Sequence, residues 1–410
     1  MQPWLAGLIA WLARLVDALT DPLMGRLSDG VRWRAGRRRP FFLIGMLPFG
    51  LSFALLWTTP FTTQASMFAW YLAVYVALAL AMTVVSVPYM ALIPEMARDY
   101  DERTSLNTWR SGAAVLGTMV AASFFLLADG LGGGASGYAR AGALLAVWIV
   151  LPWPLVFRAS FEPPRRVERP PVRFLPALAS LARHGSYLRL VAIYLAGRVA
   201  MDLLGLAVPL FVTIWLGRPG DVTFVLLAML AVVVASLPVW LRFARHREKH
   251  HVLAIGSLWL VVGLVVVFFA SPAWPRTLVF VVAGALGVGY AVVDLFPWAM
   301  LGEVIDEDEL DSHERREGLY NGMFTFLRKL AGASAYMLGG FALSLSGYDS
   351  GASVQPERAV LTIRLLATLL PAACVLAALA GVTGYPLTRA RHDEIGRRLR
   401  ERATGAAGSA

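Results

Sequence analysis

The chain has 410 residues, of which 58% are hydrophobic and only 16% charged, and its formal net charge is +10. Soluble domains carry roughly 25% charged residues, so this composition, with a mean hydropathy of +0.62, excludes an ordinary soluble protein and indicates a membrane protein. The single cysteine, Cys374, excludes a disulfide framework and a multi-cysteine metal site.

Apolar runs of about 20 residues, the length that crosses about 30 Å of hydrocarbon, recur along the whole chain. We predict about eleven membrane spans, near residues 4–27, 41–59, 67–93, 108–128, 139–157, 188–216, 222–243, 253–270, 276–302, 318–345 and 359–384. The fold class is therefore an all-α, polytopic membrane protein.

The arginines cluster in alternate connections between these spans, and the opposite connections are short and nearly uncharged. This is the positive-inside pattern, which predicts an outside N-terminus and a cytoplasmic C-terminus in a plasma or inner membrane. The same distribution assigns the positive charge to contact with lipid headgroups, and we expect no nucleic-acid partner.

Two aspartates, Asp17 and Asp21, lie one helical turn apart inside the first predicted span, with Arg14 one turn earlier. Residues at this spacing project from one face of a helix. A carboxylate within the hydrocarbon layer costs several kcal/mol unless it is neutralised or paired. The pair therefore predicts a site for a cation, a proton or both.

Two stretches of the chain resemble each other, Pro88 to Asn107 and Pro297 to Asn321, and a weaker pair begins at Pro22 and Pro238. Similar offsets near 210 residues predict parallel repeats, with chance similarity of helix ends as the alternative. We divide the chain into an N-terminal half (1–157, five spans), a cytoplasmic linker (158–187), a C-terminal half (188–384, six spans) and a cytoplasmic tail (385–410). The counterpart of the span at 188–216 would precede Met1. We therefore expect either a shorter gene or a start inside a longer reading frame.

The turn after the first span predicts a gate at the cytoplasmic mouth, in which Asp29 pairs with Arg37, Arg38 and Arg39; the alternative is a plain basic loop. Glu95 and Glu303 end the equivalent apolar turns of the two repeats, and we assign both to this gate. The acidic segment 303–311 is predicted to be a loop that pairs with cytoplasmic arginines, because it lacks the glycine and terminal glutamate of a calcium loop.

The segments 17–29, 36–40, 87–106, 296–310 and 315–332 resemble, in order, the glycoside–pentoside–hexuronide:cation symporters of the major facilitator superfamily, the melibiose permease-like carriers. The resemblance covers nearly the whole chain. It implies a two-half helical bundle whose usual first helix, of twelve, is missing here.

The resemblance implies a cation site at Asp17 and Asp21, with a hydroxyl ligand from Thr83. It also places two basic residues near this site, Lys329 and, with a less certain alignment, Arg110. Lys329 has independent support, because only two of the chain's 37 basic residues are lysines. A lysine at membrane depth provides a compact charge whose pKa can shift.

The substrate cavity departs from the family pattern. An acidic sugar-binding position of the family is Ser86 here, and another is lost with the missing helix. Other polar residues fall within spans, namely Arg198, Asp202 and Asp294. The resemblance implies that their helices line the cavity, although Arg198 and Asp202 could simply neutralise each other.

The sequence therefore predicts a monomeric secondary symporter, coupled to Na⁺ or H⁺, for a sugar, a glycoside or another small polar solute. We expect no cofactor and no metal beyond a possible Na⁺. A lipid-like substrate remains open among transporters. A sensor or an inactive fragment is the alternative from another class. An enzyme is disfavoured because the sequence holds no catalytic constellation.

Overall fold

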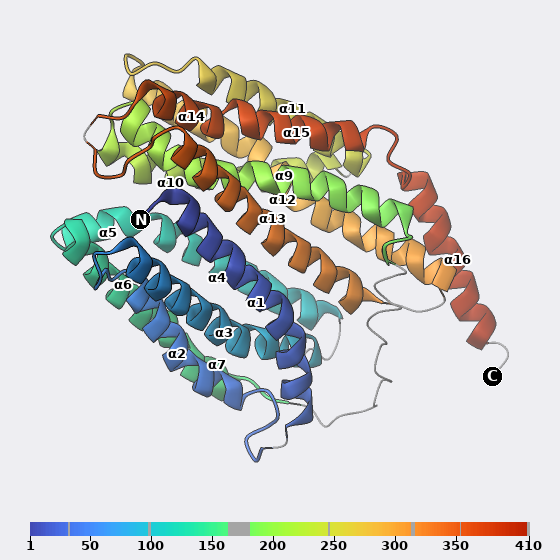
Figure 1. Cartoon of the computed structure of the whole chain (residues 1–410). Coiled ribbons are helices and arrows are strands. Elements are labelled where there is room, and N and C mark those ends of the chain that lie inside the picture. Colours follow the sequence, from blue (N-terminus) through green and yellow to red (C-terminus); the bar gives the residue numbers. More distant parts are fainter. Residues whose placement is uncertain are drawn as a thin grey trace. The chain divides into compact units, whose positions relative to one another are not determined.

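The computed structural model of the chain describes residues 1–31, 33–96, 100–162, 181–244, 247–312, 316–352 and 354–407. Within these ranges the regular structure is helical, apart from an isolated bridge between Trp33 and Gly36. The chain divides into two compact units, Met1–Arg169 and Pro170–Ala410 (Figure 1).

The first unit is built from helices that pack side by side along their lengths. They are α1 (Pro3–Gly30), α2 (Pro40–Leu56), α3 (Gln64–Met96), α4 (Tyr100–Ala122), α5 (Phe124–Gly130), α6 (Gly134–Val150) and α7 (Pro152–Ala159). Helices α1, α2 and α7 begin with a proline in their first turn, where the missing N–H costs nothing. Helix α3 packs on both α1 and α2, and α2 also packs on α6.

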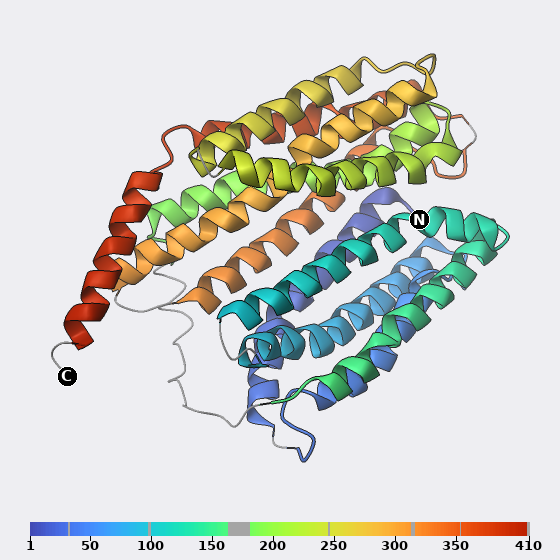
Figure 2. The same ribbon diagram turned by 180° about the vertical axis from the view of Figure 1, so that it is seen from behind.

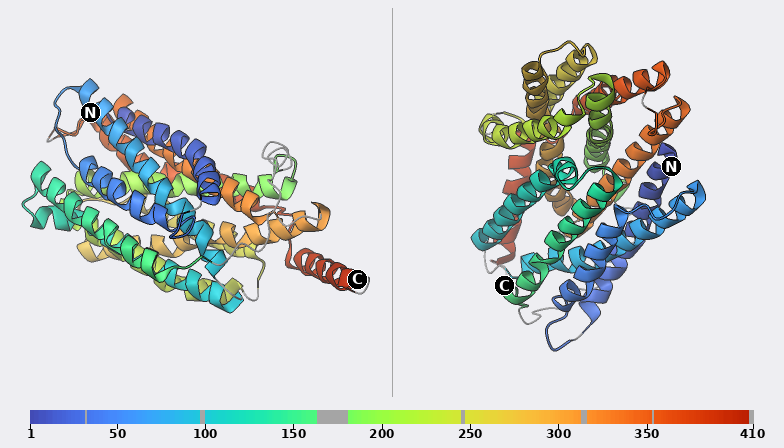
Figure 3. Two further views of the ribbon diagram at one scale, coloured as in Figure 1. Left: turned by 90° about the horizontal axis from the view of Figure 1, so that it is seen from below. Right: turned by 90° about the vertical axis from the view of Figure 1, so that its left-hand side faces the viewer.

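The second unit has one long helix, α9, in contact with most of the others. Its elements are α9 (Gly185–Leu210), a π turn (Phe211–Trp215), a 3₁₀ turn (Pro219–Asp221), α10 (Val222–Ala244), α11 (Lys249–Phe268), α12 (Arg276–Ser312), α13 (Glu317–Leu345), α14 (Glu357–Ala367), α15 (Leu369–Val382) and α16 (Arg389–Ala407). Helix α9 contacts α12, α13, α14 and α15. Helix α16 packs on α12, at the end where α12 stops (Figures 2 and 3).

The two units share one packing scheme. In the first, α3 packs on α1 and α2, and α2 packs on α6; in the second, α12 packs on α10 and α11, and α11 packs on α15. The matching helices α1 and α10, α2 and α11, and α3 and α12 begin about 210–220 residues apart, close to the predicted offset of the repeats, whereas α6 and α15 begin about 235 residues apart. Helix α9 has no counterpart among the described helices of the first unit.

Small residues allow the helices of the second unit to approach closely. A Cβ atom on Gly289 of α12 would lie 2.8 Å from the carbonyl oxygen of Gly256 on α11. A Cβ atom on Gly197 of α9 would lie 2.8 Å from Cγ1 of Val293 on α12. Such contacts are the usual means of helix association in a membrane, where lipid is as apolar as the side chains.

Each predicted span falls on a helix or a pair of consecutive helices. Among the described residues, eight helical stretches are long and apolar enough to cross a membrane. The predicted spans that are not among these eight fall on α2, which has 17 residues, on α4 with α5, and on α13. Helix α13 carries Arg328 and Lys329 in mid-helix, which lowers its hydropathy.

One predicted element was wrong. The acidic segment 303–311, predicted as a loop, continues α12 to Ser312. Its carboxylates are paired there, Glu303 with Lys249 and Asp308 with Arg316, so the helix is not interrupted by charge repulsion. The predicted span at 359–384 falls on one apolar stretch, which is made of two consecutive helices, α14 and α15, that meet at Thr368.

Candidate functional site

The two aspartates of α1 lie in a polar cluster within the first unit. Asp17 is buried, with 3% of its surface exposed, and its Oδ2 atom lies 2.8 Å from Nη1 of Arg14. Asp21 is half-buried, and its Oδ1 atom accepts a hydrogen bond of 2.7 Å from Oγ1 of Thr83. Thr83 comes from α3 and is also buried. The structure therefore brings together four of the residues that the sequence singled out: Arg14, Asp17, Asp21 and Thr83.

The charges of this cluster favour a bound cation. Arg14 pairs with Asp17, and Asp21 is a second carboxylate on the same helix. Carboxylates that are taken out of water are costly unless their charge is compensated. Hard cations prefer carboxylate and hydroxyl oxygens, which are the atoms that Asp17, Asp21 and Thr83 supply. No group of three or more His, Cys, Asp or Glu side chains that could hold a metal ion occurs among the described residues.

Three other residues that the sequence assigned to the site lie on α3, α4 and α13. Ser86 follows Thr83 on α3 by three residues and is half-buried. Nη1 of Arg110, on α4, lies 3.7 Å from Sδ of Met90, and its buried Nε has no hydrogen-bond partner within the described part of the chain. Lys329 is half-buried on α13 of the second unit. Its expected pairing with the aspartates requires contact between the units and stays a prediction.

A second charged cluster lies within the second unit, on α9 and α12. Nε of Arg198 donates to Oδ2 of Asp202 at 2.8 Å, and Nη2 donates to Oδ1 of the same carboxylate. Nη1 of Arg198 also lies 3.1 Å from Oδ1 of Asp294. The spacing of Arg198 and Asp202 allowed a mutual pair as one of two interpretations, and the structure shows that pair. The sequence did not indicate that Asp294 shares the same guanidinium.

Aromatic rings support this second cluster one turn away. Tyr194 of α9 stacks on Phe324 of α13, with ring centroids 4.3 Å apart. Nε1 of Trp298, on α12, donates a hydrogen bond of 3.0 Å to the Tyr194 hydroxyl. Tyr194 and Phe324 are fully buried. The rings therefore hold α9, α12 and α13 in register beside the charges.

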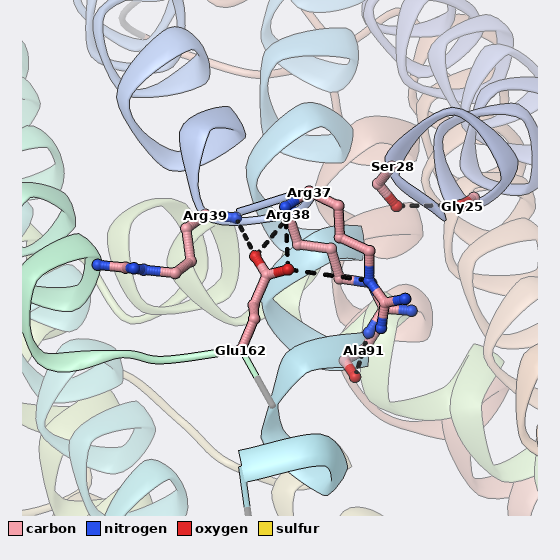
Figure 4. A network of polar contacts seen from close by, with 7 residues as sticks. All are labelled: Gly25, Ser28, Arg37, Arg38, Arg39, Ala91 and Glu162. Carbon is pink, nitrogen blue, oxygen red and sulfur yellow. Dashed lines mark hydrogen bonds and ion pairs between the residues drawn. The ribbon is translucent and has the colours of Figure 1, made fainter. Parts of the chain in front are cut away.

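The three arginines of the predicted gate bind a residue that sequence reasoning missed. Backbone N–H groups of Arg37, Arg38 and Arg39 donate to the carboxylate of Glu162 at 2.8–3.0 Å (Figure 4). Gly36, just before them, has φ of +106°, a conformation that favours glycine. Glu162 follows α7, so it joins the end of that helix to the start of α2. Its signal in the sequence was an acidic residue within a basic stretch.

The side chains of the other two acidic residues of the gate in this unit, Asp29 and Glu95, lie outside the described part of the structure. The guanidinium of Arg38 is buried and donates to the carbonyl of Ala91 on α3 at 2.8 Å. In the second unit Lys249, at the start of α11, donates to the carbonyl of Ala299 on α12 and pairs with Glu303 at 2.8 Å. Both units therefore brace equivalent helices with a basic residue.

The Glu162 contact makes a prediction about stability. Partial burial alone would raise the pKa of Glu162, but three backbone N–H groups and the Arg37 guanidinium hold the pKa below its ordinary value of 4.5. A lowered folded-state pKa stabilises the fold above the ordinary pKa, and this contribution is lost as pH falls through the folded value. Replacing Glu162 with Gln should lower the Tm at pH 7 by roughly 2–6 °C.

The measurement is thermal unfolding of the purified protein between pH 3 and pH 8. The difference in Tm between parent and variant should shrink as pH falls below the ordinary glutamate pKa and close once pH is below the lowered folded-state pKa, because both side chains are then neutral. A difference that stays constant over this range would show that charge is not the cause. Replacing Glu401, an exposed residue of α16, with Gln is the control and should leave Tm nearly unchanged.

Two helical units with a shared packing scheme are the architecture expected of a membrane transporter built from parallel repeats. A solved structure of the same fold, a bacterial homologue of the human lysosomal transporter Spinster in an inward-facing and unoccupied conformation, matches with a TM-score of 0.67. The match covers 98% of this chain and 91% of that chain at 12% identity, and therefore shows the fold alone.

The family follows from the sequence itself. Residues 1–389 match the family described as MFS/sugar transport protein, and the chain belongs to that family. It is 28% identical to the putative glycoside/cation symporter YagG of Escherichia coli, over 96% of this chain and 86% of that one. It is 26% identical to the sodium-dependent lysophosphatidylcholine symporter 1-A of Danio rerio, over 97% and 82%. The chain is thus a multi-span symporter-family transporter and not an enzyme.

Proposed function

We propose that this protein is a secondary symporter that uses a Na⁺ or H⁺ gradient to move a glycoside or another small polar solute. The observation that carries the proposal is the cluster of Asp17, Asp21 and Thr83, in which two carboxylates of one helix, one of them buried, lie beside a buried hydroxyl. Cation binding would offset the cost of these charges and favour the state that binds substrate. Because the coupling is reciprocal, substrate would also tighten cation binding.

The proposal extends to the surroundings of the protein. The distribution of arginines supports a cytoplasmic C-terminus and a multi-pass location in a plasma or inner membrane. The relative named as an inner membrane symporter, YicJ of Escherichia coli, supports the same compartment. We propose a monomer without a cofactor, in which the coupling ion is the only inorganic ligand.

A lipid-like substrate is the second candidate, and the similarity to lysophosphatidylcholine symporters favours it. Such a substrate carries a phosphate and a quaternary ammonium, whereas a glycoside presents uncharged hydroxyl groups. Both candidates share the cation site, so evidence of coupling alone does not choose between them.

The test is uptake into vesicles that contain the purified full-length protein. Imposed Na⁺ and H⁺ gradients are compared separately, each with labelled glycosides and with labelled lysophosphatidylcholine. Accumulation above the external concentration that depends on one gradient is the expected result. Equilibration of every solute to equal concentrations under both gradients would contradict symport and would leave the sensor as the better hypothesis.

A further inference from the structure

The second charged cluster has an unequal pair of carboxylates, and the difference indicates which one meets substrate. Asp202 is 7% exposed, and both of its oxygens bind Arg198. Helix α13 closes over it, since a Cβ atom on Gly332 would lie 2.6 Å from Oδ2 of Asp202. Asp202 is therefore an internal partner that fixes the guanidinium.

Asp294 is more exposed than Asp202 and binds Arg198 through only one oxygen. Its side chain is 42% exposed, and only its Oδ1 atom contacts Arg198. The other oxygen, Oδ2, has no hydrogen-bond partner in the part of the chain that the structure describes. The hydroxyl of Tyr290, one turn earlier on α12, interacts electrostatically with both Asp294 and Arg198. An exposed carboxylate oxygen, oriented through its partner oxygen, is an acceptor for a donor group from outside the unit.

The total charge of the cluster decides which donors it accepts. Arg198 donates from each of its three guanidinium nitrogens to the two carboxylates, whose negative charges more than compensate its positive charge. One cation and two anions sum to −1. An anionic solute beside Asp294 would meet a like charge, and their repulsion grows as the bound solute displaces water from between the two charges. A neutral solute would instead donate hydroxyl hydrogens to the carboxylate.

We propose that Asp294 is a specificity-determining residue that selects uncharged, polyhydroxylated solutes such as glycosides and rejects their uronate counterparts. The inference rests on the proposed function, because it assigns a substrate class to that transporter. It goes further by assigning charge selection to one carboxylate of the C-terminal half, and by giving Asp202 the separate role of a positioning residue.

The test uses two matched ligand pairs that differ only at C6, methyl glucoside with methyl glucuronide and methyl galactoside with methyl galacturonide. Binding to the purified full-length protein is measured by ligand-dependent tryptophan fluorescence. We expect the parent to bind at least one glycoside about 10-fold or more tightly than its uronate, the discrimination typical of one charged hydrogen bond. Asp294→Asn should reduce that ratio by about 10-fold, because it weakens glycoside binding and relieves repulsion of the uronate.

Two variants control the comparison. Asp294→Ser tests the same loss of charge with a smaller side chain, should the asparagine variant not fold. Asp349→Asn removes a carboxylate from the connection between α13 and α14 of the same half. It should leave the ratio at the parent value. A parent that binds glycoside and uronate equally, or a ratio that Asp294→Asn leaves unchanged, would overturn the inference.

Other outcomes are equally decisive. If the parent binds lysophosphatidylcholine and neither glycoside, the assigned substrate class is wrong. Accumulation under ion gradients is measured separately from binding. Selective glycoside binding without gradient-driven accumulation would therefore contradict symport and leave the role of Asp294 standing. Gradient-driven uptake that does not distinguish glycoside from uronate would support symport and overturn the selection.

Discussion

Replacing Asp21 with Asn should abolish gradient-driven uptake, with a loss of at least about 100-fold, while facilitated exchange of substrate persists in part. Asparagine keeps the Oδ1 atom that accepts the hydrogen bond from Thr83, so the contact between α1 and α3 is retained. The substitution removes one of the two carboxylate charges, while Asp17 keeps its ion pair with Arg14. With one negative charge fewer, the cluster no longer binds the coupling cation tightly.

Uptake and exchange are measured on the same vesicles, so their ratio does not depend on the amount of folded protein. Thr83→Ser keeps the hydroxyl and should retain most of the coupled uptake, whereas Thr83→Val removes a ligand oxygen at nearly constant volume and should reduce it by roughly 10-fold. Fully coupled uptake by Asp21→Asn would refute the cation site. A loss of exchange as large as the loss of uptake would point to a structural role for Asp21.

The sequence could predict those parts of the site that depend only on which residues share a face of one helix. The spacing of Asp17 and Asp21 on α1, and of Arg198 and Asp202 on α9, gives each pair a common face without reference to any other element. The position of Thr83 beside Asp21 came from the resemblance to known symporters. No local pattern in α3 indicates which hydroxyl meets α1.

The parts that were missed depend on contacts between distant segments. Asp294 reaches Arg198 because Gly197 lets α9 approach α12 at Val293, the neighbour of Asp294. Such a close approach depends on both helices, and a single glycine in an apolar run does not predict which helix will pack against it. Glu162 likewise binds a turn that is 125 residues away in the sequence. Hydrophobic periodicity contains no information on that pairing.

The acidic end of α12 shows that a run of charged residues does not by itself predict a loop. Five carboxylates between residues 303 and 309 suggested a solvated connection, yet Lys249, His184 and Arg316 pair with three of them. Glutamate has good helix propensity once its charge is compensated. The helix therefore continues to Ser312, and its end provides the surface on which α16 packs.

Replacing Arg198 with Met should destabilise the second unit by about 3–5 kcal/mol, the usual cost of leaving a buried charge without its partner. Asp202 and Asp294 then lose the cation that both of them bind. Asp202 lies on α9, which contacts α12, α13, α14 and α15, so the unpaired charge affects much of the unit. The measurements are the yield of monodisperse protein and its Tm in detergent. Arg397→Met, which removes an exposed ion pair of α16, is the control and should cost less than about 1 kcal/mol.

A charge-neutral triple variant separates the loss of charge from the loss of packing. Adding Asp202→Asn and Asp294→Asn to Arg198→Met removes both uncompensated carboxylates. Most of the lost Tm should return, because the two carboxylates no longer repel each other and no charge is left without a partner. A triple variant that is no more stable than Arg198→Met would show that the arginine acts by filling space between α9 and α12. A single variant as stable as the parent would show that water reaches both carboxylates, and that the cluster is not a buried charge.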